Sequence, residues 1–127
     1  MFIFPTEAPA TLEWPVTVEL PSNGGATLKQ TFTGTFRRLS DAEGDALRKT
    51  CERPDLEGQT IRGGEENAAF FGAVLSDWQG VTDEAGSPVP YSAERLKTLL
   101  TGISSIPLAI GLWRAWGEMR TGAAAKN

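Results

Sequence analysis

The sequence contains no histidine and a single cysteine, Cys51, among its 127 residues. Without histidine, the chain lacks the usual near-neutral acid–base group and the commonest metal ligand. Mechanisms that depend on histidine, such as those of serine hydrolases, cysteine hydrolases and histidine-ligated zinc sites, are therefore excluded. A lone cysteine cannot form an internal disulfide, so we expect the protein to work in a reducing compartment.

Positive charge and long apolar runs are also scarce. The 12 lysines and arginines are outnumbered by 16 aspartates and glutamates, which gives a net charge of −4. That balance offers no electrostatic reason to bind nucleic acid or an anionic membrane. No apolar run approaches the ~18 residues of a membrane span, and the first residues, MFIFP, lack the basic start of a signal peptide. We expect a cytoplasmic protein with no nucleic-acid or membrane partner.

The composition that remains is that of an ordinary globular domain, with 40% hydrophobic and 22% charged residues. The length predicts a single domain over residues 1–127. Within it, residues 1–38 have the pattern of a β-hairpin region and residues 40–121 the pattern of a helical region. Residues 122–127 form a small polar tail that we expect to fray.

Two alternating segments predict an antiparallel hairpin. A turn signal at Pro21–Gly25 separates a strand at residues 14–20 from a second strand at Ala26–Arg37. Gly34 falls on the apolar face of the second run, which indicates a bulge or a close backbone approach. Phe2–Phe4 is a candidate third strand. The apolar face of the first run consists of Trp14, Val16, Val18 and Leu20.

The hydrophobic period then changes to that of helices, so the predicted fold class is α+β, a hairpin followed by about four helices. Ser40 and Glu43 fit a capping box, Pro54–Gly64 reads as a loop, and Ser105 is the expected cap of the last helix. In the third helix we expect three leucines to point inward: Leu96, Leu99 and Leu100. The expected helices are Ser40–Cys51, Glu65–Trp78, Ser92–Leu100 and Ser105–Thr121.

Candidate chemical groups have simpler structural explanations. Cys51 stands next to Glu52 and has no histidine to promote thiolate formation, so a packed thiol is favoured over a nucleophile. The acidic residues Asp77, Asp83 and Glu84 lack the alternating ligand spacing of a calcium loop. We therefore expect no enzyme activity, no cofactor and no metal.

The last helix is apolar on more than one side. Trp113, Trp116 and Met119 recur at intervals of three, and Ile106 and Ile110 extend the same stripe. One side must be core, and a second apolar side needs either full burial or a partner. Tryptophan and arginine are enriched in interface hot spots, so both a core role and a partner-binding role remain open here. The candidate partner-binding residues are Trp113, Arg114, Trp116 and Met119.

The chain resembles the tail assembly chaperones of long-tailed, siphovirus-type bacteriophages. The matching segments are Phe70–Val81, Asp83–Ser92 and the final helix with its Lys126-Asn127 end. The residues that define this motif most clearly are Phe71, Trp78, Pro90, Tyr91 and Ser92.

The resemblance implies a protein that binds the tape-measure protein, keeps it soluble and helps recruit tail-tube subunits in the cytoplasm of an infected or lysogenic bacterium. It also implies that a ribosomal frameshift near the end of the gene can make a longer product. An alternative is a structural phage tail or head–tail connector subunit, a homo-oligomer that forms a ring in the virion through the edges of its hairpin.

Overall fold

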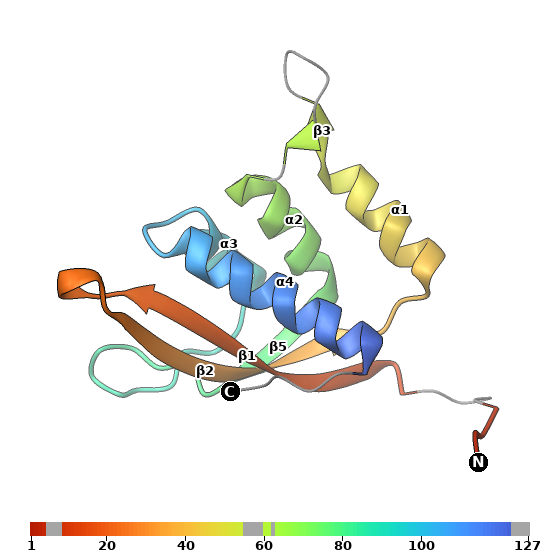
Figure 1. Ribbon diagram of the computed structural model, residues 1–127, viewed down its shortest axis with the longest axis horizontal. Helices are drawn as coiled ribbons and strands as arrows, with labels where there is room; N and C mark the ends of the chain where they lie inside the picture. Colours follow the sequence, from red (N-terminus) through yellow and green to blue (C-terminus); the bar gives the residue numbers. More distant parts are fainter. Residues whose placement is uncertain (5–8, 55–59, 62, 123–127) are drawn as a thin grey trace.

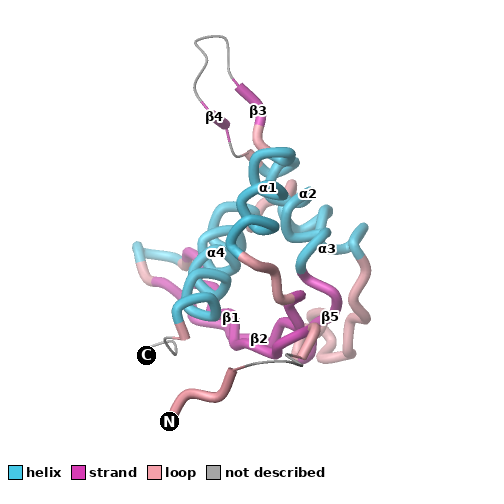
Figure 2. The backbone as a smooth tube through the Cα atoms, turned by 90° about the vertical axis from the view of Figure 1, so that its right-hand side faces the viewer, coloured by secondary structure: helices cyan, strands magenta, loops and turns pink. Residues whose placement is uncertain are grey.

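The computed structural model describes residues 1–4, 9–54, 60, 61 and 63–122, and it has the α+β fold that the sequence predicts (Figure 1). An antiparallel sheet of three strands in the order β1-β2-β5 carries four α-helices on one face, as Figure 2 shows from the side. The main elements are β1 (Thr11–Pro21), β2 (Thr27–Arg37), α1 (Asp41–Cys51), α2 (Gly64–Val74), β5 (Leu75–Gln79), α3 (Ala93–Leu100) and α4 (Ser105–Thr121).

The predicted hairpin is confirmed. β1 and β2 pair in one continuous register, from Thr11 opposite Arg37 to Pro21 opposite Thr27. A short 3-10 turn, η1 (Asn23–Gly25), connects them, and its positive φ angles of 76° and 83° fall on Gly24 and Gly25. These angles need glycine, because a side chain would clash with the backbone. β1 forms one edge of the sheet, which is where a strand that contains Pro15 belongs.

The third strand is β5 and not the predicted Phe2–Phe4 segment, which is exposed and pairs with no strand. The predicted helix Glu65–Trp78 is wrong at its end, because α2 stops at Val74 and the chain continues directly into β5. Trp78 pairs opposite Gly34 on the free edge of β2. A short apolar run fits either a helix or a strand. Here the run forms a strand because it pairs with the open edge of β2.

Gly34 provides the close approach that its position in the sequence indicates. A Cβ atom at this residue would lie 2.9 Å from Leu75 Cδ1 and 2.9 Å from Phe36 Cε2. The pairing of β2 with β5 also shifts register between Thr35 and Phe36. The missing side chain at Gly34 therefore lets the apolar residues of β5 and β2 pack over the centre of the sheet.

The start of α1 is confirmed as a capping box. Ser40 Oγ accepts from the Glu43 backbone N–H at 3.2 Å, and Glu43 Oε1 accepts from the Ser40 N–H at 3.1 Å. After α1 the chain was expected to form a loop, but its described parts pair as two short antiparallel strands, β3 (Arg53–Pro54) and β4 (Thr60–Ile61).

The last two helices differ from the prediction in two details. Ser92 caps α3 as expected and accepts from the Arg95 N–H at 3.1 Å. The N-cap of α4, however, is Ser104 and not Ser105, and its side chain makes no capping hydrogen bond. Leu99 was expected to point inward, but it is 40% exposed. Of the three leucines, only Leu96 and Leu100 are buried in the core.

The hydrophobic core lies between the sheet and the helices. α4 crosses β1 so closely that a Cβ on Gly111 would lie 2.5 Å from the backbone oxygen of Thr17. The largest fully buried side chains come from β1, β2, α2, β5, α3 and α4: Val16, Phe36, Phe70, Phe71, Val74, Leu75, Leu96, Leu100 and Leu112. Of the predicted tail, Gly122 ends α4 in a left-handed conformation, and residues 123–127 lie outside the described part of the chain.

Candidate partner-binding groove

The two tryptophans of α4 have different environments. Trp116 is 4% exposed and packs against Phe36 and Phe70 with ring centroids 6.2 Å and 5.6 Å away. It is therefore a residue of the hydrophobic core. Of the two roles that the sequence left open, the core role applies to Trp116.

Trp113 is half-buried between α4 and α2. Its indole ring stacks on Phe70 at 4.7 Å and meets Phe71 edge-on at 4.8 Å. Its Nε1–H donates to Oδ1 of Asn67 at 2.9 Å, and the Asn67 side chain is itself buried. The contacts fix the ring, so the part that reaches the surface belongs to a rigid wall.

The other two candidate partner-binding residues on α4, Met119 and Arg114, also differ in exposure. Met119 is half-buried and packs against the core, whereas Arg114 is exposed. The exposed apolar residues on this helix are Ile106 at 71% and Ile110 at 54%. The sequence places these isoleucines on the same stripe as the tryptophans, but their exposure depends on how α4 is rotated against β1, which no local pattern reveals.

Ile106, Ile110, Trp113 and Arg114, but not Met119 or Trp116, line a groove of about 780 Å³ between α2 and α4, which we call the α2–α4 groove. Its wall is mostly apolar, and Arg114 is the charged residue in the lining. Gly64 permits this arrangement, because a side chain there would collide with the backbone oxygen of Leu100. The full lining is Gly63, Gly64, Asn67, Leu100, Ser105, Ile106, Ala109, Ile110, Trp113 and Arg114.

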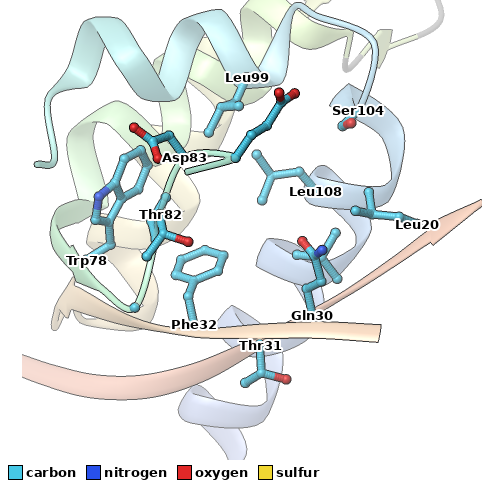
Figure 3. A pocket seen from close by; sticks show the side chains of 14 residues that line it. Leu20, Gln30, Thr31, Phe32, Trp78, Thr82, Asp83, Leu99, Ser104 and Leu108 are labelled. Atoms are coloured by element: carbon cyan, nitrogen blue, oxygen red, sulfur yellow. The ribbon is translucent and has the colours of Figure 1, made fainter. Parts of the chain in front are cut away.

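A second opening of about 650 Å³ lies near the end of the sheet that carries the β1–β2 turn, and we call it the hairpin cleft (Figure 3). Leu20, Phe32, Leu99 and Leu108 form apolar walls, and Gln30 points into the space between them (Figure 3). Other lining residues are Val18, Thr31, Trp78, Gly80, Val81, Thr82, Asp83, Glu84 and Ser104.

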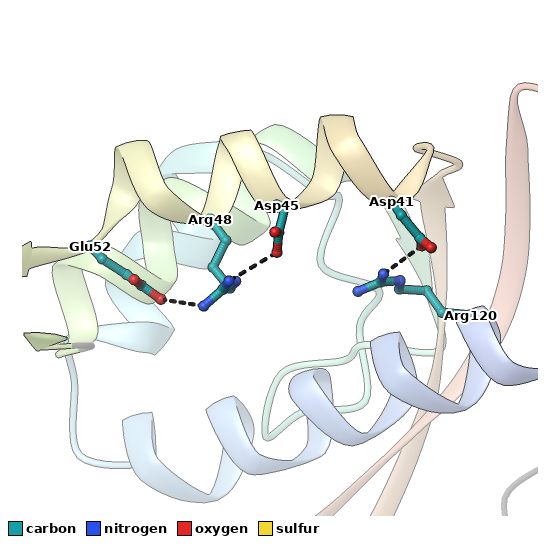
Figure 4. A network of polar contacts seen from close by, with 5 residues as sticks. All are labelled: Asp41, Asp45, Arg48, Glu52 and Arg120. Atoms are coloured by element: carbon teal, nitrogen blue, oxygen red, sulfur yellow. Dashed lines mark hydrogen bonds and ion pairs between the residues drawn. The ribbon is translucent and has the colours of Figure 1, made fainter.

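A chain of ionic contacts runs along α1 beside α4 (Figure 4). Arg48 bonds Asp45 at 2.9 Å and Glu52 at 3.2 Å, and Arg120 of α4 reaches Asp41 at 2.8 Å. The hydrogen bond from Arg48 lowers the pKa of the Asp45 carboxyl. The Arg120–Asp41 and Arg48–Asp45 pairs each have an exposed carboxylate, so these two pairs add little stability, whereas the side chain of Glu52 is only 13% exposed. They orient α1 and α4 and place no reactive group in either cavity.

The motif residues 71–92 have structural roles in the fold. Phe71 is fully buried, and Trp78 Nε1–H donates to the backbone oxygen of Val89 at 2.7 Å. The Tyr91 hydroxyl donates to the Leu75 oxygen at 2.6 Å, and the Pro90 oxygen accepts from Arg95 Nη1 at 2.9 Å. Together with the Ser92 cap, these bonds hold the segment after β5 against the strand.

The acidic turn after β5 is also explained without a bound ion. Asp83 Oδ1 accepts from the backbone N–H groups of Ala85 and Ser87, both at 2.9 Å. Among the residues that the structure describes, no three of the aspartate, glutamate and cysteine side chains gather closely enough to hold a metal. Cys51 is half-buried at the end of α1.

Within the described ranges, no single helix is long and apolar enough to cross a membrane. α3 and α4 taken together meet that test of length and composition, but they are bent by 118° where they meet.

Residues 63–111 match the family model described as YdaY prophage protein. The match indicates a phage or prophage protein. It covers α2, β5, α3 and the first part of α4, and thus every residue that lines the α2–α4 groove except Trp113 and Arg114. No curated protein and no solved structure matches the chain.

Proposed function

We propose that this protein is a phage tail assembly chaperone that binds the tape-measure protein through the α2–α4 groove. In this role it keeps the tape-measure protein soluble and helps recruit tail-tube subunits in the cytoplasm of the infected or lysogenic host. The observation that carries the proposal is an open, mostly apolar groove on a phage-type protein. The role is one of binding and not of catalysis.

The spacing of the groove residues supports a helical client. Ile106 and Ile110 are four positions apart on α4, and Trp113 follows three positions later. The ridge that such residues form accepts the apolar stripe of a second helix, which presents side chains at the same intervals. A long helical protein with exposed apolar stripes, such as a tape-measure protein, fits this surface.

The groove also suggests a charge requirement in the client. Arg114 stands at one end of the apolar wall and is exposed. An acidic residue at the corresponding end of the client helix would meet it there, and such rim charges set orientation and specificity more than affinity.

The alternative is a structural tail or head–tail connector subunit that forms a ring in the virion. The long edge strand β1 favours it, because an open edge offers backbone groups to a neighbour. Pro15 opposes strand pairing along this edge, because it has no N–H to donate. The chaperone is therefore the first candidate.

Co-expression with the tape-measure protein tests the proposal. We expect a larger soluble fraction of the tape-measure protein and co-purification of the two proteins. An insoluble client with no co-purification would contradict the chaperone role.

Mass spectrometry of purified virions separates the two candidates. The chaperone proposal predicts that the chain is missing from mature particles. A fixed copy number in the particles would support the structural alternative.

A further inference from the structure

The hairpin cleft combines apolar walls with negative charge. Its walls are mainly leucine and aromatic side chains. Among the described residues that line it, the charged ones are Asp83 and Glu84, and none is a lysine or an arginine. The α2–α4 groove has the opposite character, because its charged residue is Arg114. The two openings are therefore suited to ligands of different charge.

The turn that carries these carboxylates is held in place by its own hydrogen bonds. The backbone N–H of Asp83 donates to the Ser87 oxygen at 2.9 Å, and the N–H of Val89 donates to the Val81 oxygen at 2.9 Å. The side-chain hydrogen bonds of Asp83 in the described structure all reach Oδ1, which accepts from the Ala85 and Ser87 N–H groups. A carboxylate has two acceptor oxygens. Oδ2 of this fixed carboxylate can therefore accept from a ligand.

The arrangement of the walls matches the build of a lysine side chain. Figure 3 shows Trp78 and Asp83 on one side of the cleft and Leu20 and Leu108 on the other. A lysine has an apolar four-carbon stem and a terminal ammonium group, so it lies along apolar surface while its charged end reaches a polar partner. Here the stem would contact the leucines and the half-buried ring of Phe32, and the ammonium group would meet the carboxylates.

Other ligands fit this opening less well. A wholly apolar occupant would cover the carboxylates of Asp83 and Glu84 and displace their water without replacing it, which costs free energy. An anionic ligand would be repelled by the same two groups. Among the residues that the structure describes, no three acidic or cysteine side chains gather closely enough to hold a metal ion. A basic side chain with an apolar stem satisfies both the walls and the charge.

We propose that the hairpin cleft binds a lysine side chain of a partner protein, in a segment where apolar residues flank the lysine. The volume of about 650 Å³ is larger than one lysine side chain. The remaining apolar wall favours a lysine with apolar neighbours over a free amine. The cleft and the α2–α4 groove share no lining residue, so the inference does not depend on the chaperone role.

An NMR titration of the isotope-labelled full chain tests the site. The probes are two blocked peptides, acetyl-Leu-Lys-Leu-amide and acetyl-Leu-norleucine-Leu-amide, which differ in the ammonium group alone. Trp78 lines the cleft and Trp113 lines the groove, so their indole N–H signals report on the two openings separately. We expect the lysine peptide to shift the Trp78 signal and to bind about tenfold more tightly than the norleucine peptide at low salt. Added salt should reduce this preference.

The double variant Asp83→Asn/Glu84→Gln tests the role of the carboxylates. Asparagine keeps an oxygen that accepts from the Ala85 and Ser87 N–H groups, so the turn should remain folded. The variant should bind the two peptides equally weakly. The control Glu94→Gln removes an exposed carboxylate outside the cleft lining and should bind like the wild type. Glu84→Gln alone leaves the side chain of Asp83 unchanged and repeats the test if the double variant unfolds.

Three results would overturn the proposal: no shift of the Trp78 signal with the lysine peptide, equal binding of the two peptides by the wild-type protein, or a lysine preference that survives in the variants. Spermidine that binds as tightly as the lysine peptide would also overturn it, because the cleft would then be a site for free amines. Failure of the tape-measure protein to co-purify would contradict the chaperone role and leave this site intact.

Discussion

At the scale of single residues, the glycines of α4 show how tightly this helix lies on the sheet. A Cβ on Gly111 would lie 2.5 Å from the Thr17 backbone oxygen, whereas a Cβ on Gly117 would meet nothing within 4 Å. The first glycine is required by packing against β1. The second is a weak point in the helix, because glycine costs backbone entropy there.

These two glycines therefore predict opposite effects for the same substitution. Gly111→Ala should lower the free energy of unfolding by about 1–3 kcal/mol, since the backbone of β1 must move. Gly117→Ala should raise it by about 0.5–1 kcal/mol. Urea denaturation of both variants measures the difference. Equal effects would show that α4 does not cross β1 at Gly111.

The capping box of α1 makes a second prediction, which concerns pH. The Ser40 N–H, followed by the Ser40 hydroxyl, lowers the pKa of the Glu43 carboxyl from its ordinary value of 4.5. A lowered pKa in the folded state stabilises the fold above pH 4.5, and this contribution is lost as the pH falls through the pKa of folded Glu43.

Glu43→Gln keeps an acceptor for the Ser40 N–H but does not titrate. The melting temperature of this variant should therefore fall less than that of the wild type between neutral pH and pH 3. Parallel curves for the two proteins would contradict a role for this carboxylate in the cap.

At the scale of elements, the segment that follows α2 is the part of the fold where the sequence misleads. Phe70 to Trp78 has the pattern of one helix, yet the helix stops at Val74 and the chain becomes β5. The Tyr91 hydroxyl helps to hold the new strand through its 2.6 Å bond to the Leu75 oxygen. Burial, with a contribution from Asp77, raises the pKa of Tyr91, so the hydroxyl stays protonated and donates this bond at neutral pH.

Tyr91→Phe should consequently destabilise the protein by about 1–2 kcal/mol, because it deletes this donor. The variant keeps the aromatic contact with Trp78, whose ring centroid lies 5.0 Å away. Hydrogen exchange should accelerate most at the amides of β5. A variant with wild-type stability and exchange would show that the bond does not hold the strand.

Local signals in the sequence were sufficient for some elements but not for others. The capping box at Ser40, the hairpin turn at Gly24 and the cap at Ser92 depend on neighbouring residues, and the sequence predicts them correctly. The end of α2 depends on the distant free edge of β2. The pairing of β3 with β4 likewise joins residues that no alternating pattern in the sequence marks as strands.

For the candidate site, too, the sequence predicts some features and misses others. The sequence identifies α4 as the helix with surplus apolar residues, and Trp113 and Arg114 do line the α2–α4 groove. It cannot show that Trp116 is buried and Ile110 exposed, because that depends on the rotation of α4 set by its contact with β1 at Gly111.

At the scale of the whole molecule, the fold has two separate openings, the α2–α4 groove and the hairpin cleft. The α2–α4 groove is proposed to receive the client. The two surfaces have separate linings except that both lie beside the α3–α4 connection, where Ser104 borders the cleft and Ser105 borders the groove. Substitutions can therefore test each surface separately.

The central claim concerns the groove, and Ile110 and Leu28 offer a matched test because both are 54% exposed. Ile110 lines the groove, and Leu28 lies on β2 outside it. Ile110→Asp should weaken tape-measure binding tenfold or more by placing a charge in the apolar wall. Leu28→Asp should leave binding unchanged, and both variants should stay folded.

The most direct measurement is the amount of tape-measure protein that co-purifies with each variant after co-expression at matched levels. The account predicts wild-type recovery with Leu28→Asp and a loss with Ile110→Asp. Equal recovery with both variants would contradict the assignment of the α2–α4 groove as the client site.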